Sequence, residues 1–276
     1  MSVASQITRK AKSNLAFALK ILPTDRRQDM VTFYAFCRTI DDLADDPAIP
    51  LDERAKSLND WESGLAHGFP SPDEFQTEIL SLRERQAIPN DLLLAIIDGC
   101  RSDLQPQRFQ TQQELAAYIW KVACAVGLVS IKIFGCKDPA SEKYAVALGQ
   151  ALQLTNILRD IGEDLANGRR IYLPLDDLAR FGYTEHDLLA RIHDGRFHAL
   201  MTYEADRAEA YFNEAERILP AADRQALLPA RMMGEVYQLL LHRMRADQFR
   251  VFEKRYRVSK ARKLMILTKH LIARSR

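Results

Sequence analysis

Apolar residues recur at helical spacing along almost the whole chain of 276 residues. In the clearest stretch they step by three and four positions, which traces one stripe over roughly five helical turns. No stretch alternates apolar and polar residues between turn signals, as a half-buried strand would. The sequence therefore predicts an all-α protein. The clearest stripe is formed by Leu115, Ile119, Val122, Val126, Val129 and Ile133.

Prolines and glycines divide this pattern into roughly ten helices joined by short connections. No internal repeat is present, so we expect one domain over residues 1–276. Three polar residues that directly precede helical segments are predicted N-caps, because their side chains can accept hydrogen bonds from free backbone N–H groups. They are Thr24, Ser141 and Thr184.

Composition excludes several classes of protein. The net charge of +2 provides no basic field for nucleic acid. No apolar run reaches the ~20 residues that span a bilayer, and the N-terminus lacks the apolar core of a signal peptide, so we expect a cytoplasmic protein without a transmembrane helix. Single cysteines without a C-x-x-C pair are typical of reduced, packed thiols. They are Cys37, Cys100, Cys124 and Cys136.

Two otherwise apolar segments carry acidic residues four positions apart. Asp41 and Asp45 form the first row; Asp160 and Asp164 form the second, which Asn156 extends by one turn. On a helix this spacing turns by ~40° and rises by ~6 Å, so each row lines one face. A solvated helix end is the usual meaning of one such row. However, like charges at this spacing repel, and both rows continue directly from apolar sequence.

A cluster of hard cations would resolve this repulsion. Magnesium takes oxygen ligands and shares them with substrate phosphates, so two facing rows predict a diphosphate held through bridging Mg²⁺ instead of an all-protein metal cage. Arg38 lies one turn before Asp41, and Arg159 directly precedes Asp160. Guanidinium groups can form bidentate hydrogen bonds with diphosphate oxygens. Simple charge balance with the neighbouring carboxylates explains these arginines equally well. Gln153 adds an amide beside the second row.

Two tyrosines accompany the acidic segments. Tyr34 lies seven positions before Asp41, and Tyr118 begins a stretch with small residues that would leave room beside the second row. Aromatic faces stabilise carbocations. Core packing is the alternative role for each of these rings.

Three motifs make the sequence resemble the squalene/phytoene synthase family of head-to-head prenyl diphosphate synthases. They are YAFCRTIDDLAD (34–45), YIWKVACAVGLVSIKIFG (118–135) and LGQALQLTNILRDIGEDLANGRRIYLP (148–174). The resemblance spans nearly the whole chain, and the third motif is highly specific. It implies a single-domain α-helical isoprenoid synthase fold with helices around a central apolar cavity. Near the N-terminus the chain departs from many relatives at KSNLAF (12–17), which affects Lys12 and Ser13.

The resemblance also implies roles for individual residues. Asp41, Asp45, Asn156, Asp160 and Asp164 would be Mg²⁺ ligands. The diphosphate contacts would come from Arg38, Gln153 and Arg159, with Tyr34 and Tyr118 near the reacting carbons, and further substrate contacts from Tyr237, Arg255 and Lys263.

The reaction implied by the resemblance joins two allylic diphosphates through a cyclopropylcarbinyl diphosphate. The residues of the second and third motifs most resemble those of bacterial hopanoid-type presqualene diphosphate and squalene synthases. This resemblance favours two farnesyl diphosphates as the substrates. A phytoene synthase that uses two geranylgeranyl diphosphates is the alternative. Reduction to squalene would need NADPH, and this requirement stays open, as do the oligomeric state and the exact product. A catalytically dead scaffold protein on the same fold is disfavoured because both acidic rows are intact.

Two further expectations concern the cavity and the C-terminus. Val122, Val126 and Val129 would close a cavity that prefers C15 over C20 chains, since steric closure discriminates chain length better than contact area. The segment after residue 253 is a basic amphipathic stretch that includes Leu264 and Ile266. It could rest peripherally on the inner face of a membrane or pack as an ordinary last helix, and packing is the simpler reading.

Overall fold

The computed structural model describes residue 4 and residues 19–274, so Lys12 and Ser13 lie outside the described residues. The described part is helical, as predicted, and contains no strand; only an isolated bridge joins Arg108 to Ile171. The elements are η1 (Leu19–Ile21), α3 (Thr24–Asp45), α4 (Leu51–His67), α5 (Glu74–Arg85), α6 (Asn90–Ser102), α7 (Gln112–Ile119), a π-helical turn η2 (Trp120–Cys124), α8 (Ala125–Phe134), α9 (Ala140–Ala166), α10 (Leu175–Arg180), α11 (Glu185–Leu189), α12 (Gly195–Ile218), α13 (Leu228–Ala246) and α14 (Lys260–Arg274).

The predicted N-caps are correct at one position of three. Thr184 caps α11 in a reciprocal capping box with Asp187. At α3 the capping position is Pro23, so Thr24 is already the first helical residue. Ser141 lies inside α9, and its hydroxyl donates to Asp223 at 2.7 Å. A tertiary acceptor has replaced the local cap there.

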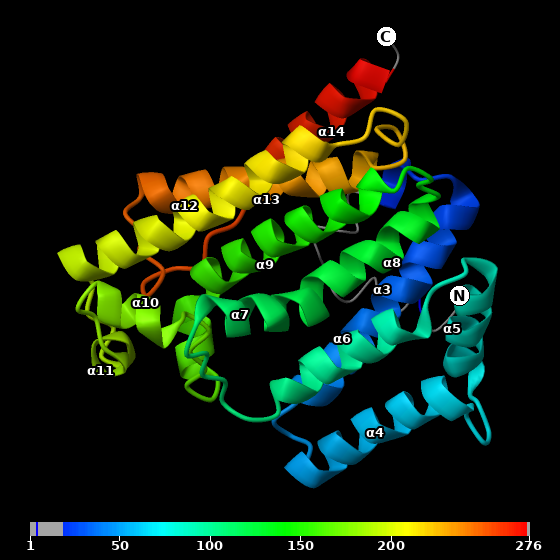
Figure 1. Ribbon diagram of the computed structural model, residues 1–276, viewed down its shortest axis with the longest axis horizontal. Coiled ribbons are helices and arrows are strands. Elements are labelled where there is room, and N and C mark those ends of the chain that lie inside the picture. The colour runs from blue at the N-terminus through cyan, green and yellow to red at the C-terminus, as the bar shows by residue number, and fades with distance from the viewer. Residues whose placement is uncertain (1–3, 5–18, 275–276) are drawn as a thin grey trace.

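Helix α9 runs through the middle of the molecule, between α7–α8 and α12–α13 (Figure 1). It is 27 residues long and contains no proline. Gly149 allows close packing against the π-helical turn, because a Cβ there would lie 2.9 Å from the Cα of Cys124. The second acidic row is therefore carried by a helix that packs against α7, α8, α12 and α13.

The continuous helical stretch Gln112–Phe134 is long and apolar enough to cross a membrane by length and composition, contrary to our expectation that no such run exists. A core helix of a globular protein meets the same criterion. Here Leu115, Ile119 and Ile133 are fully buried, and the stretch packs on α6 and α9. Its apolar character serves the interior of this fold.

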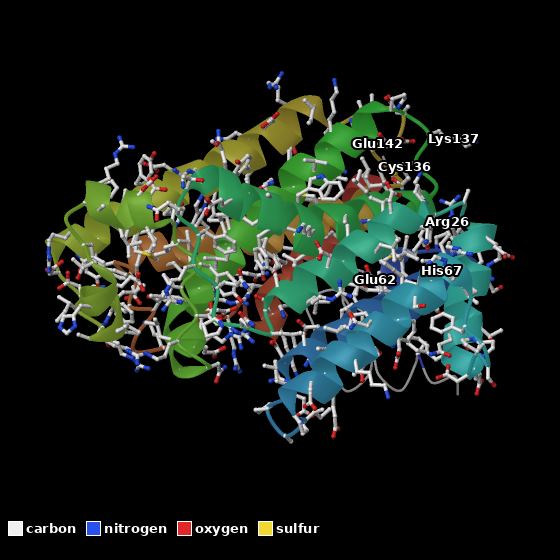
Figure 2. The ribbon with its side chains drawn as sticks, turned by 60° about the horizontal axis from the view of Figure 1, so that its bottom comes forward. Arg26, Glu62, His67, Cys136, Lys137 and Glu142 are labelled. Atoms are coloured by element: carbon white, nitrogen blue, oxygen red, sulfur yellow. The ribbon has the colours of Figure 1, made fainter. Side chains whose placement is uncertain are left out.

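Two apolar clusters form the core. One is built by η2 and helices α7 to α14, and the other by α3 to α6 together with the outer part of α8. Arg26 of α3 closes one end by donating to the carbonyl of Phe134, and Figure 2 shows Arg26 on the same side of the molecule as Cys136 and Lys137. All four cysteines carry free thiols in the structure, two of them buried. Helices α3 and α9, which carry the acidic rows, thus belong to different clusters.

Candidate active site

The first acidic row lies on a half-exposed face at the C-terminal end of α3. The side chains of Asp41 and Asp45 are 48% and 44% exposed. Arg38 donates to Oδ2 of Asp41 at 2.9 Å and also pairs with Asp42. Partial burial lowers the pKa of Arg38, but the charges of Asp41 and Asp42 raise it above its ordinary value, and Tyr34 adds to the rise. The structure therefore groups the predicted residues of α3.

The second row is more enclosed and already paired with cations. Asp160 is 17% exposed and Arg159 is 12% exposed, and Nε of Arg159 donates to Oδ1 of Asp160 at 2.8 Å. From the opposite side, Nε of Arg255 lies 3.0 Å from the same oxygen, while its Nη1 lies 2.8 Å from Glu163. Asp160 is thus held between two guanidinium groups.

Gly162 explains how the distant Arg255 reaches this row. A Cβ at Gly162 would lie 2.5 Å from the carbonyl oxygen of Val251, so only glycine lets the segment after α13 pack this closely on α9. Tyr237 of α13 also approaches the row. Burial lowers the pKa of Arg159, but the hydrogen bond and charge of Asp160 raise it, and Tyr237 contributes to that rise.

Asn156 carries an oxygen that fits a metal ligand. Its Nδ2 donates to Oε1 of Gln153 at 3.3 Å, whereas its Oδ1 is buried and has no hydrogen-bond partner among the described residues. A buried unpaired carbonyl oxygen is unfavourable unless another group satisfies it, and Mg²⁺ prefers oxygen donors. No three His, Cys, Asp or Glu side chains of the described residues are grouped closely enough to hold a metal alone. A metal here would share its ligand shell with phosphate or water.

Arg170 connects the two rows, and sequence reasoning did not select it. After α9 the chain turns tightly through Gly168 and Arg169, both with positive φ, so that the backbone N–H of Arg170 donates to the carbonyl of Asp164 at 3.0 Å. The side chain then reaches α3, where Nη2 donates to Oδ1 of Asp45 at 2.7 Å. Its position inside the quoted motif RRIYLP was the available sequence signal.

Asp103 was also missed, and it lies between the rows. It accepts hydrogen bonds from the hydroxyls of Tyr118 at 2.7 Å and Tyr172 at 2.8 Å, and its carbonyl accepts from Arg170 at 3.0 Å. The rings of Tyr118 and Tyr172 stack at 5.4 Å and pack with Phe109. Burial raises the pKa of Asp103 although both hydroxyl bonds lower it. The segment RSDLQP carries no pattern that marks this role.

The carboxylates repel each other within each row, and Asp103 adds negative charge to both rows. Burial, followed by the charge of Asp45, raises the pKa of Asp41 to about 6. Burial, followed by the charge of Asp160, raises the pKa of Asp164 to about 7. Asp103 contributes to both shifts. This shared negative field is the expected property of a site that receives cations.

Some predicted residues stand apart from the acidic rows. Lys263 is half-buried on α14, burial lowers its pKa, and its side chain has no hydrogen bond or ion pair with either row in the described part of the chain. Val129 is fully buried in the core cluster of α3 to α6, so it is a packing residue and not a wall of a cavity. Val122 and Val126 are half-buried and stay candidates for that wall.

Two hollows are present beside these elements. A small cavity of about 10 Å³ adjoins Asp164, Arg170 and Tyr172, which suffices for roughly one water. A larger hollow of about 640 Å³ lies between α3 and α5 and is lined by Asp29 and Arg85. Asp29 is three turns or more along α3 from Asp41, so the larger hollow is separate from the acidic rows.

The sequence matches the family described as squalene/phytoene synthase over residues 8–262. A 15-cis-phytoene synthase of Synechocystis sp. is 34% identical over 279 residues, which cover 96% of this chain and 82% of the relative. A presqualene diphosphate synthase of Rhodopseudomonas palustris is 32% identical and covers 94% of this chain and 93% of the relative.

Solved structures show the same helical architecture. The squalene synthase HpnC from Alicyclobacillus acidocaldarius superposes with a TM-score of 0.80 at 28% identity, covering 90% of this chain and 93% of that chain. A dehydrosqualene synthase in complex with a ligand gives a TM-score of 0.81 at 28% identity, covering 99% of this chain and 95% of that chain. The predicted all-α isoprenoid synthase fold is confirmed by this similarity.

Proposed function

Because the chain belongs to the squalene/phytoene synthase family, we propose that it joins two farnesyl diphosphates head to head to give presqualene diphosphate. Members of this family condense prenyl diphosphates and are prenyltransferases that use a divalent metal to ionise the diphosphate. One observation carries the proposal. Helices α3 and α9 each bear an acidic row, and a carboxylate of each row forms an ion pair with an arginine.

The proposed binding mode follows from the charges at the site. Asp41 and Asp45 would hold Mg²⁺ from one side, and Asn156, Asp160 and Asp164 from the other. When bound, Mg²⁺ would stabilise the negative charge of the departing diphosphate. The buried Oδ1 of Asn156, which has no hydrogen-bond partner among the described residues, supports this set of metal ligands.

The arginines supply the second part of the proposed mechanism. Arg38, Arg159 and Arg255 are now paired with carboxylates of the rows. As the carboxylates bind cations, these guanidinium groups would turn to the diphosphate oxygens, where bidentate hydrogen bonds orient it. The ionised carbon chain would then face aromatic rings, whose π faces stabilise a carbocation; Tyr34 and Tyr118 are the candidates.

Condensation of two geranylgeranyl diphosphates to phytoene is the second candidate function. It is favoured by relatives named phytoene synthase at 34% identity over most of this chain. The C15 proposal is supported by the relative named presqualene diphosphate synthase and by the solved structures named squalene and dehydrosqualene synthase.

Product analysis distinguishes the candidates. The purified protein would be incubated with Mg²⁺ and either C15 or C20 diphosphate, with and without NADPH, and the Asp41→Asn variant would serve as the inactive control. We expect presqualene diphosphate from the C15 substrate. Efficient formation of phytoene from the C20 substrate would overturn the C15 proposal, and release of no pyrophosphate from either substrate would overturn the enzymatic proposal.

A further inference from the structure

Helix α14 exposes an apolar strip to solvent. Leu264 and Met265 are 59% and 56% exposed, the highest values among the exposed large apolar side chains of the described residues. Together with Ala261 and Thr268, also exposed, they fall at positions i, i+3, i+4 and i+7 of one helical face. We call these four residues the α14 outer face. Exposed apolar residues are common on proteins, so this strip is informative only together with the charges that border it.

The opposite side of α14 already accounts for the packing of this helix. Ile266 is buried against the core, and His270 Nε2 lies 3.0 Å from Oε2 of Glu235 on α13. On the flank of the helix, one turn after Met265, the exposed Lys269 pairs with the other oxygen of Glu235 at 2.9 Å. The α14 outer face is therefore not needed to fasten the helix, and in Figure 1 the C-terminal end of α14 projects beyond the other helices.

The charged residues that the C-terminal segment itself places beside the α14 outer face are all cations. Residues 254–276 contain no aspartate or glutamate. Lys260 and Arg262 are exposed in the first turn, and Nη1 of Arg262 lies 3.9 Å from the sulphur of Met265, so that positive charge directly borders the apolar strip. An apolar strip flanked by lysine and arginine matches the interfacial region of an anionic bilayer, where apolar side chains enter the acyl boundary and cations contact headgroups.

We propose that the α14 outer face docks on an anionic lipid surface. Charge complementarity favours this occupant over a second copy of the chain, because two cationic faces would repel each other. Docking goes beyond the condensation reaction proposed above, and it holds or fails independently of that reaction.

The test is sedimentation of the full chain with vesicles of phosphatidylcholine alone and of phosphatidylcholine mixed with phosphatidylglycerol. We expect binding to the anionic vesicles that weakens as salt is raised. Replacing Leu264→Ser together with Met265→Ser, or Lys260→Gln together with Arg262→Gln, should each weaken binding at least about fivefold. The matched control is Leu51→Ser with Ile192→Ser, which removes exposed apolar side chains on other segments and should leave binding unchanged.

Three results would overturn the proposal. The first is equal binding to neutral and anionic vesicles. The second is an equal loss of vesicle binding in the control and the α14 variants. The third is a wild-type dimer that does not bind vesicles and becomes monomeric in the Leu264/Met265 variant. Condensation assayed with detergent-dispersed substrate should be the same in the α14 variants and wild type, so failure to dock and failure to catalyse remain distinguishable.

Discussion

The acidic rows on α3 and α9 share one spacing but occupy different environments. On α3 the carboxylates are nearly half exposed, and Arg38 beside them is 44% exposed. On α9, Asp160 is 17% exposed and lies between Arg159 and Arg255. The difference arises from the position of the helices, since α9 is enclosed by α7, α8, α12 and α13 whereas α3 borders α4 to α6 and α8. The same D-x-x-x-D pattern therefore gives an open half and an enclosed half of the proposed site.

This contrast implies different consequences when a charge is removed. A carboxylate in the open half is screened by water, so its loss should affect function alone. In the enclosed half, Asp160 also neutralises the guanidinium groups of Arg159 and Arg255, so its loss should affect function and folding together.

The largest effect is expected for Asp160→Asn. We expect turnover to fall at least about 100-fold, because a charge that stabilises the departing diphosphate is removed, and the free energy of unfolding to fall by about 1–3 kcal/mol, because Arg159 loses its closest anion. Steady-state kinetics and urea unfolding measure the two quantities.

Asp41→Asn is the matched variant in the open half. Turnover should fall as strongly as in Asp160→Asn, while the free energy of unfolding stays unchanged or rises because repulsion with Asp45 is relieved. Equal destabilisation by both variants would contradict the proposed contrast between the rows. Wild-type turnover in either variant would contradict the two-row site.

Asp103→Asn tests the connection between the halves. An amide accepts weaker hydrogen bonds from Tyr118 and Tyr172 and no longer faces Arg170 with a charge, so we expect turnover to fall roughly 10- to 100-fold through misplaced tyrosines. Spectroscopic titration of the tyrosine hydroxyls distinguishes misplaced tyrosines from a general loss of structure. Burial, followed by the negative charge of Asp103, raises the pKa of both tyrosines. Both should therefore ionise at lower pH in the variant, and unchanged tyrosine titration would show that Asp103 does not control them.

Asp164 predicts a pH dependence of the metal-free protein. In the folded state its pKa is raised from 3.8 to about 7, so the folded protein holds this proton more tightly than the unfolded chain does. The resulting contribution to stability is fully present below the unfolded pKa. This contribution is lost as the pH rises from about 4 to about 7. At pH 8, Asp164→Asn should therefore be more stable than wild type by about 1–3 kcal/mol, below the ~4 kcal/mol that the full shift would give. Urea unfolding at pH 5 and pH 8 without metal tests this, and a stabilisation of equal size at both values would contradict it.

The smallest effect is expected for Arg170→Gln. Its ion pair with Asp45 joins a 17% exposed cation to a 44% exposed anion, so the free energy of unfolding should change by less than about 1 kcal/mol. Turnover should fall roughly tenfold at low Mg²⁺ and recover at high Mg²⁺, because the open row is no longer oriented toward α9. A defect that Mg²⁺ does not reduce would assign Arg170 a different role.

The all-α class and the two rows were predictable because both depend on local periodicity, whereas the isoprenoid synthase fold was implied only by the family resemblance. The helical spacing indicated the helices, and the interval of four placed Asp41 with Asp45 and Asp160 with Asp164 on single faces. Arg255 and Tyr237 were reached only through the family resemblance, since Gly162 and the segment beside it bring them to α9 by tertiary packing.

The bridging residues could not be predicted in this way. Asp103 bonds to Tyr172 across 69 positions of the chain, and Arg170 bonds to Asp45 across 125. Such pairs leave no periodic signal in a single sequence. The error at Ser141 has the same origin, because its hydroxyl found the distant Asp223 in place of its own helix end.

Pyrophosphate binding in a double-mutant cycle tests most directly whether both rows hold one metal–diphosphate cluster. Calorimetric titration with Mg²⁺ present would compare wild type, Asp41→Asn, Asp160→Asn and the double variant. If the rows act on one cluster, the double variant loses little more binding free energy than the more affected single variant. Losses that add up fully, or wild-type binding that does not depend on Mg²⁺, would contradict a shared site.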